Sequence, residues 1–384
     1  MIVSRLILKN WRNFRDVDVN LRERTFIVGP NASGKSNLLD VFRFLRDIAK
    51  TEGGGLQKAI RDRGGISKVR CLAARKQPDI VVELRLAESS NDPVSWRYSL
   101  GIKQQTRGER LPYISHEKVW RQDQEIITRP NDDDRKDEAR LTQTYLEQIS
   151  ANADFREISR FLRSVTYLHL VPQLVRYADA FQGKRLEDDP FGQGFLEAVA
   201  KAPDRTRTNR LKKVEEALKI AVPQMQQLKF LRDTINGRPH LEALYSHWRP
   251  HAGLQREDQF SDGTLRLIAL LWCLLGNNSL LLLEEPESSL NAAIVNKLAP
   301  LISRTQKQRK QQVILSTHSD DLLSDKGIDP TEVLLLIPDA EGTQVRPAAK
   351  FKDVKLLLEG GMSVGEAILP LNTPKNIEQL RLFE

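Results

Sequence analysis

Cysteine is scarce in this chain of 384 residues, which contains only Cys71 and Cys273. Neither belongs to a Cys-x-x-Cys motif, so the sequence excludes a disulfide framework and a cysteine-based metal site. Long apolar runs are also missing, since none approaches the roughly 20 residues of a transmembrane helix. Residues 1–5 lack a basic segment followed by an apolar one, so we expect no secretory signal, no membrane association and a cytoplasmic location.

Aromatic residues make up only 6% of the chain, but a hydrophobic fraction of 40% is sufficient for a packed core and excludes a disordered protein. The sequence contains no internal repeat of 20–50 residues, and no heptad pattern is long enough for a coiled coil. The length indicates two domains, or one large domain with an insertion.

Positive charge is only slightly in excess, with 59 Lys and Arg against 51 Asp and Glu, and it is unevenly distributed. Residues 201–250 hold 11 basic and 5 acidic residues, whereas residues 123–138 hold 3 and 7. Charge runs are commonly solvated faces. Basic clusters at 58–76 and 205–213 could nevertheless contact DNA phosphates, and such binding would depend on salt.

Hydrophobic periodicity predicts a chain in which strands alternate with helices in its last third, which is typical of a mostly parallel sheet covered by helices. A strand pair opens the chain, and a short strand follows at 25–28. The predicted later strands are 80–86, 94–102, 112–128, 280–283, 313–317, 332–337 and 343–346, and the predicted helices begin near Asn37 and cover 138–164, 207–222, 264–275, 291–309 and 353–359.

Residues 29–36 match the pattern G-x-x-x-x-G-K-[ST] in full, between an apolar strand and a helix. Such a loop turns consecutive backbone N–H groups towards phosphate oxygens, and the helix adds its positive end. Lys35 can reach the β- and γ-phosphates, and Ser36 can ligate Mg²⁺. We therefore expect ATP and Mg²⁺ to bind here, at Gly29, Pro30, Asn31, Ala32, Ser33, Gly34, Lys35, Ser36 and Asn37.

Three further patterns fit a nucleotide hydrolase. The apolar strand 280–283 ends in Glu284, placed to hold Mg²⁺ through water, and Glu285, placed to act as the base that orients the attacking water. Ser261 and Gly263 lie at the start of an apolar helix and offer a second anion site. His318 follows another buried strand and could touch the γ-phosphate or the catalytic water.

In this order, the four motifs resemble the heads of ABC-type ATPases, and more closely the RecF/SMC/OLD branch of standalone prokaryotic AAA-type ATPases. Residues 6–14 look like the LxLxNFRxF start of that branch. The resemblance covers 1–45 and 255–340. It implies an α/β P-loop NTPase of the ABC-ATPase head type, with an antiparallel β lobe and an inserted, mainly helical subdomain. The predicted parts are 1–175 (P-loop and β lobe), 176–255 (basic helical insertion) and 256–384 (signature, acidic strand and His318).

The same resemblance implies a homodimer that sandwiches two ATP molecules, with higher oligomers open. Ser261 and Gly263 would contact the γ-phosphate of the partner's ATP, and residues 288–291 would cross the dimer axis. Arg12 and Asn13 would join the nucleotide site, and Gln173, with Gln182 as second choice, would line the metal. Two departures stand out: Asp262 brings a carboxylate into the signature, and Glu284 stands where Asp is commoner.

The functional prediction is an ATPase that works with DNA, and with a separately encoded Toprim-type nuclease or other effector, in anti-phage defence or DNA repair. About 40 residues follow Arg346, too few for a Toprim domain. A regulatory scaffold that binds ATP with little turnover is the alternative. An ABC transporter subunit is disfavoured, since Lys35 and Ser261 lie 226 positions apart. A structural clamp of the SMC type would need long heptad arms.

Overall fold

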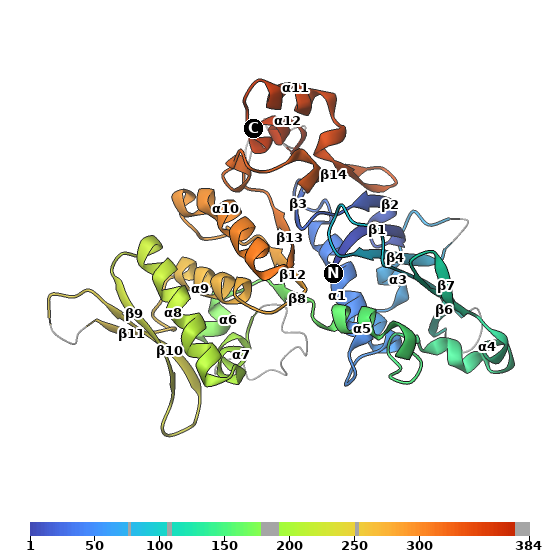
Figure 1. Ribbon diagram of the computed structural model, residues 1–384, viewed down its shortest axis with the longest axis horizontal. Helices are drawn as coiled ribbons and strands as arrows, with labels where there is room; N and C mark the ends of the chain where they lie inside the picture. Colours follow the sequence, from blue (N-terminus) through green and yellow to red (C-terminus); the bar gives the residue numbers. More distant parts are fainter. Residues whose placement is uncertain (76–77, 106–109, 178–191, 250–252, 373–384) are drawn as a thin grey trace, which may run out of the picture. The chain divides into compact units, whose positions relative to one another are not determined.

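Residues 1–75, 78–105, 110–177, 192–249 and 253–372 are described by a computed structural model in which the chain forms two compact units (Figure 1). Unit 1 consists of Met1–Thr166, Asn278–Leu282 and Lys310–Glu384, and unit 2 of Tyr167–Asn277 and Leu283–Arg309. The predicted three-part division follows the ATPase halves rather than these units, and it stays a prediction.

The sheet that carries the phosphate loop is built around β3 (Arg24–Val28), whose five residues are all buried. A strand that is buried on both faces is typical of a parallel sheet covered by helices on each side. β3 runs parallel to β13 and β14, and β15 is antiparallel to β14. The strand order is β15-β14-β3-β13-β12-β8, with β8 Thr166–Leu168, β12 Leu280–Glu284, β13 Gln312–Thr317, β14 Val333–Asp339 and β15 Gly342–Pro347.

An antiparallel lobe of six strands forms the other sheet of unit 1, in the order β2-β1-β4-β5-β6-β7. Its first two strands form the predicted opening hairpin, in which Leu6 and Leu8 pair with Val19 and Val17 and are buried. The predicted strands of the lobe are confirmed, except that a turn divides the predicted segment 112–128 into two strands. Their bounds are β1 Ile2–Trp11, β2 Phe14–Asn20, β4 Ile80–Ala87, β5 Trp96–Gln104, β6 Pro112–Arg121 and β7 Gln124–Arg129.

The helices of unit 1 begin with α1 (Lys35–Ala49), which directly follows the phosphate loop and buries Leu38, Leu39, Phe42 and Leu45, as the spacing predicted. The others are short. They are α2 Leu56–Asp62, α3 Ile66–Val69, α4 Asp132–Lys136, α5 Arg156–Arg163, α11 Lys352–Glu359 and α12 Val364–Asn372, with 3-10 turns at Glu138–Thr142, Ala153–Phe155, Leu322–Ser324, Pro330–Glu332 and Ala348–Lys350.

Unit 2 contains the signature helix α9 (Asp262–Leu274), which packs against α8 and α10. It also contains a three-stranded antiparallel sheet, in the order β11-β10-β9, within the insertion that was predicted to be mainly helical. The remaining elements are α6 Pro172–Arg176, α7 Phe195–Lys201, α8 Asp204–Ala221, β9 Met225–Arg232, β10 Pro239–Tyr245, β11 Leu254–Arg256 and α10 Ala292–Arg309.

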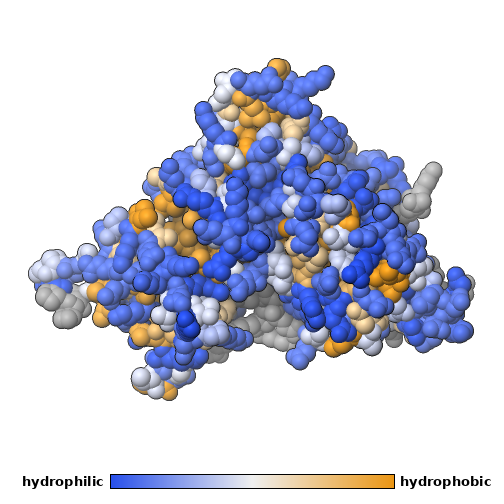
Figure 2. Space-filling view, in the orientation of Figure 1, coloured by the Kyte–Doolittle hydropathy of each residue, from blue (hydrophilic) through white to orange (hydrophobic). Residues whose placement is uncertain are grey.

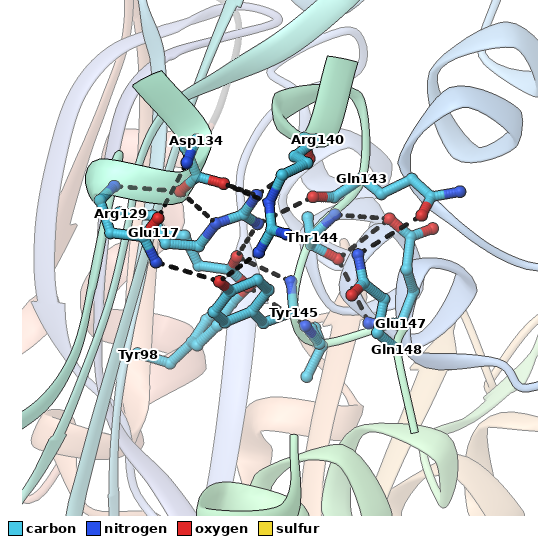
Figure 3. Close-up of polar contacts among 12 residues, drawn as sticks. Tyr98, Glu117, Arg129, Asp134, Arg140, Gln143, Thr144, Tyr145, Glu147 and Gln148 are labelled. Atoms are coloured by element: carbon cyan, nitrogen blue, oxygen red, sulfur yellow. Dashed lines mark hydrogen bonds and ion pairs between the residues drawn. The ribbon is translucent and has the colours of Figure 1, made fainter. Parts of the chain in front are cut away.

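The predicted helix over 138–164 is wrong for its first two thirds. The backbone N–H groups of Tyr145 and Leu146 donate to the buried carboxylate of Glu117, and Arg129 donates to the carbonyl of Gln143 (Figure 3). These bonds use backbone groups that a helix would need for its own ladder. Only α5, near the end of the segment, is an α-helix.

Apolar side chains are exposed on the two last helices and in the connection between them, where Leu356, Met362, Leu369 and Leu371 are each more than 40% accessible. Figure 2 shows a face that is mostly hydrophilic, with an apolar region over α11 and α12. None of the helices in the described ranges combines the length and the hydropathy that a membrane span requires.

Candidate active site

The phosphate loop and His318 meet at one edge of the core sheet. β13 is parallel to β3, and Thr317 pairs with Val28, so Gly29 and His318 each follow the end of a neighbouring strand. Carboxyl ends of parallel strands are where α/β sheets bind ligands. The His318 side chain is exposed at this edge. Two segments almost 290 positions apart therefore lie side by side at the same edge of the sheet.

The backbone of the loop has the shape of a phosphate cradle. Ala32 and Gly34 take positive φ angles of 62° and 101°, and alternating handedness of this kind turns N–H groups inward. The Lys35 ammonium is buried and donates to the carbonyls of Gly29 and Pro30 at 2.9 and 3.4 Å. The Lys35 ammonium therefore lies against the loop, where its positive charge is suited to bind phosphate oxygens. The loop residues therefore fit ATP.

Asn13 holds the loop from outside. Its Nδ2 donates to the carbonyl of Ser33 and to Oγ1 of Thr343, both at 2.8 Å, and its Oδ1 accepts from the Asn37 amide at 2.8 Å. A Cβ on Gly34 would lie 2.2 Å from Asn13 Nδ2, so only glycine fits there. Asn13 and Asn37, both predicted nucleotide ligands, are bound to each other beside the loop.

Arg12, also predicted as a nucleotide ligand, forms an ion pair of 2.6 Å with Asp40 of α1. Arg63 binds the same carboxylate at 2.9 Å and reaches Asp47 as well. Burial opposes ionisation of Asp40, but Arg63 and Arg12 together hold its pKa below the usual value. This network ties the opening hairpin and α2 to the helix that follows the phosphate loop.

The two predicted catalytic carboxylates lie at the end of β12, with Glu284 as its last residue and Glu285 directly after it. Glu284 accepts a hydrogen bond from the hydroxyl of Tyr167, which lies in β8 of the same sheet. Glu285 has a φ of 44°, a left-handed conformation that is strained for a residue with a side chain. Its carbonyl accepts from Ser288 N at 3.1 Å, so the chain turns sharply at this residue. Strain of this kind clusters at functional sites.

The signature residues lie at the start of α9. Ser261 is the N-cap, and its hydroxyl accepts from Thr264 N at 3.2 Å. A Cβ on Gly263 would lie 2.6 Å from the carbonyl oxygen of Ser289, so the signature and the predicted dimer-axis loop are in close contact within one subunit. Ser289 itself has a φ of 63°. The helix start thus presents N–H groups next to a strained, partly exposed loop.

Asp262, the unusual carboxylate of the signature, is bound by α6. Arg176 Nη1 lies 2.5 Å from Asp262 Oδ1, and Gln173 Nε2 donates to Oδ2 at 3.1 Å. Arg176 also donates to the carbonyl of Phe260, the residue before the signature serine. The negative charge of Asp262 is therefore matched inside the subunit. Gln173, predicted to line a metal, is the amide of this cluster, and Gln182 lies outside the described residues.

Three residues of this region were missed by the sequence analysis. Tyr167 contacts Glu284, and Arg176 contacts Asp262. Arg266 lies one turn after Asp262; burial lowers its pKa, and the carboxylates of Asp262, Glu285 and Glu287 oppose that shift. The i,i+4 spacing of Asp262 and Arg266 was a readable signal, whereas Tyr167 had none. Among the described residues, no group of three His, Cys, Asp or Glu side chains is arranged to hold a metal.

The chain is similar to known proteins in its sequence and in its fold. A family model described as "AAA domain, putative AbiEii toxin, Type IV TA system" matches residues 24–325. Among curated proteins, the thiamine import ATP-binding protein ThiQ of Photobacterium profundum is 36% identical over 64 residues. That match covers 17% of this chain and 27% of ThiQ, so the chain spans about a quarter of this relative.

Solved structures of SMC heads have a similar fold. An SMC head bound to the C-winged helix domain of ScpA matches with a TM-score of 0.52 at 16% identity, over 90% of this chain and 98% of that one. The SMC head domain from Thermotoga maritima matches with a TM-score of 0.49 at 15% identity, over 90% and 99% of the two chains. The first likeness confirms the predicted head-type fold.

Proposed function

The chain belongs to the AAA-domain family whose model matches residues 24–325, and from this we propose that ATP joins two copies of it head to head. It is a nucleotide-binding ATPase of the AAA/ABC type with the fold of an SMC head. The observation that carries the proposal is the phosphate cradle, with its buried Lys35, beside His318 at the edge of the core sheet.

Each predicted residue has a role in this proposal. Lys35 and the loop N–H groups hold the phosphates, Glu285 orients the attacking water, and His318 contacts the water or the γ-phosphate. Hydroxyl, carboxylate and amide oxygens suit Mg²⁺, so Ser36, Glu284 and Gln173 would hold that ion. When bound, Mg²⁺ neutralises charge on the phosphates.

A carboxylate in the signature would by itself repel phosphate, and the ion pair between Arg176 and Asp262 reduces that repulsion. With Arg176 at 2.5 Å, the charge of Asp262 is compensated before a partner's ATP approaches. Ser261, Gly263 and the N-terminus of α9 then present hydrogen-bond donors and a positive helix end. This arrangement supports binding of the γ-phosphate across the dimer.

We also propose that the dimer acts on DNA together with a separately encoded effector, in anti-phage defence or DNA repair. The basic cluster at 205–213 supports DNA contact better than the one at 58–76. In the latter, Arg63 is committed to Asp40 and Asp47, and Lys58 is paired with Asp62. An SMC head of similar fold binds a domain of ScpA, which supports a partner protein here, a Toprim-type nuclease being one candidate.

Two substitutions test the enzyme against the scaffold. Lys35→Ala removes the cation from the phosphate cradle, and we expect loss of both ATP binding and turnover. Glu285→Gln removes the base, and we expect turnover to fall about 100-fold or more while ATP stays bound. Phosphate release and equilibrium ATP binding are measured on the same preparations. Unchanged hydrolysis in Glu285→Gln would show that the base is assigned wrongly, and undetectable wild-type turnover would favour the scaffold.

A further inference from the structure

An open pocket of about 200 Å³ lies in unit 2, where α8 meets the ends of α9 and α10. α8 contributes Thr206, Asn209, Arg210 and Lys213, which share one face of the helix because they are spaced three and four apart. The chain after α9 contributes Leu275 and Asn277, and α10 ends in the pocket with Arg309. The pocket is distinct from the phosphate loop, which belongs to unit 1.

The charge of this pocket is unbalanced. Its lining has three cationic side chains and no carboxylate. No acidic group in the described part of the chain lies within ion-pair distance of Arg210, Lys213 or Arg309. Among the described residues, these three cations form one hydrogen bond, which runs from Arg309 to Asn277 at 3.4 Å. By contrast, Arg207 on the next face of α8 is paired with Asp204 and donates to the carbonyls of Ala200 and Ala202 at the end of α7.

Arg210 is held in place by packing. Its guanidinium lies 4.5 Å from the ring centroid of Trp272, a buried residue of α9, in a cation–π contact. Burial lowers the pKa of Arg210, and the nearby charge of Arg309 lowers it further. A guanidinium on a rigid helix whose charged form is disfavoured by burial and by a second arginine is an arrangement that an anion stabilises.

The negative ends of the helix dipoles explain only part of this cluster of cations. α9 and α10 both end at the pocket, and cations are favourable near helix C-termini, which accounts for Arg309. It does not account for a second guanidinium on α8, stacked on Trp272 and repelled by the first. The asparagine and threonine side chains beside them add donors that suit phosphoryl oxygens.

We propose that the pocket between α8, α9 and α10 binds a phosphate group of a polynucleotide backbone. This deepens the proposed function, since it rests on the DNA contact inferred there, and it names the residues: Arg210 and Arg309 as the main ligands, with Lys213 beside them. It also separates them from Arg207, whose side chain supports the start of α8.

The test compares two double variants of the full chain with equal loss of charge on the same two helices. Arg210→Gln/Arg309→Gln removes two of the three pocket cations, and Lys219→Gln/Lys307→Gln removes exposed cations that lie outside both the pocket and the basic cluster at 205–213. Duplex DNA binding is measured at several salt concentrations. We expect the pocket variant to bind about tenfold more weakly and its plot of log K against log salt to be shallower by about one. The control should match the wild type.

Further measurements separate a loss of DNA binding from a loss of folding, and a polynucleotide phosphate from a free phosphate. Arg309→Gln alone changes an exposed helix end, so it tests the pocket even if replacing Arg210 impairs folding, which melting curves would reveal. Inorganic phosphate is titrated into the DNA-free protein. If phosphate binds tightly while the two double variants bind DNA with equal affinity, the pocket is a site for free phosphate and the proposal is overturned. Equal DNA affinity and slope with no phosphate binding would overturn it too. The DNA-free ATPase rate of the wild type tests the proposed function separately.

Discussion

At the scale of single residues, Asn13 is the side chain that fixes the phosphate loop. It donates to Ser33 O and to Thr343 Oγ1, and it lies so close to Gly34 that a Cβ on that residue would clash with it. We expect Asn13→Ala to weaken ATP binding about tenfold, because the loop loses a hydrogen bond worth about 1 kcal/mol and gains freedom. Equilibrium binding of ATP measures this directly.

Thr343→Val is the matched control, since it removes one partner of Asn13 and leaves the bond to the loop. Its affinity for ATP should lie between those of the wild type and Asn13→Ala. If Asn13→Ala bound ATP as the wild type does, Asn13 would have no role in positioning the loop.

Glu147 is a second residue with a measurable signature. Burial raises its pKa to about 7, although Leu56 N, Thr144 N and the Thr144 hydroxyl all donate to the carboxylate (Figure 3). Between its unfolded value of about 4.5 and about pH 7, the folded chain holds a proton that the unfolded chain has lost. Stability therefore falls as pH rises through this window, by an amount of order 3 kcal/mol.

Glu147→Gln removes that titration, so its melting temperature should fall less between pH 5 and pH 8 than that of the wild type. Melting curves of both proteins at four or five pH values in that range give the comparison. Parallel curves for the two proteins would mean that the carboxylate titrates near its ordinary pKa.

At the scale of elements, α6 and α9 are joined by the Arg176–Asp262 pair. Arg176→Met leaves the carboxylate uncompensated at the signature, and we expect ATP turnover to fall about tenfold with a smaller change in KM. Adding Asp262→Asn removes the unpaired charge and should restore part of the loss. A double-mutant cycle on kcat gives the coupling, expected near 1 kcal/mol. Strictly additive effects would mean that the pair does not act through the signature.

The elements that the sequence predicted well are those with local signals. Glycine and lysine at fixed spacing marked the phosphate loop, and apolar periodicity marked α1, β12 and β13. The segment 138–164 was mispredicted because its helical spacing was overridden by distant partners: Glu117 and Arg129 take its backbone groups. β9–β11 were not predicted. Their solvent-facing residues interrupt the apolar pattern, with Leu254 of β11 itself half exposed.

The candidate site was predictable residue by residue, but not in its connections. The order of motifs marked Lys35, Glu285 and His318. Nothing local indicates that Tyr167 would donate to Glu284, or that Arg176 would compensate Asp262, since these pairs are joined only by the fold. The left-handed backbone of Glu285 is likewise a property of the folded turn.

At the scale of the whole molecule, the proposal stands or falls on an ATP-dependent dimer. Glu285→Gln with ATP and Mg²⁺ should have twice the monomer mass by light scattering, because ATP is bound and not consumed. Adding Lys35→Ala should return it to the monomer mass. A monomer at all ATP concentrations in Glu285→Gln would exclude the sandwich.

Gly263→Ala in the Glu285→Gln background examines the dimer surface itself. The added methyl would lie 2.6 Å from the Ser289 carbonyl, so the loop 288–291 must shift where we expect it to cross the dimer axis. We expect the ATP-dependent dimer to weaken at least about tenfold, or about 1.4 kcal/mol. Sedimentation at several protein concentrations gives the dimer constant, and ATP binding by the dilute monomer shows whether the phosphate loop is intact. An unchanged dimer constant would place the interface away from Gly263 and the loop 288–291, because a displaced loop cannot support the same contact.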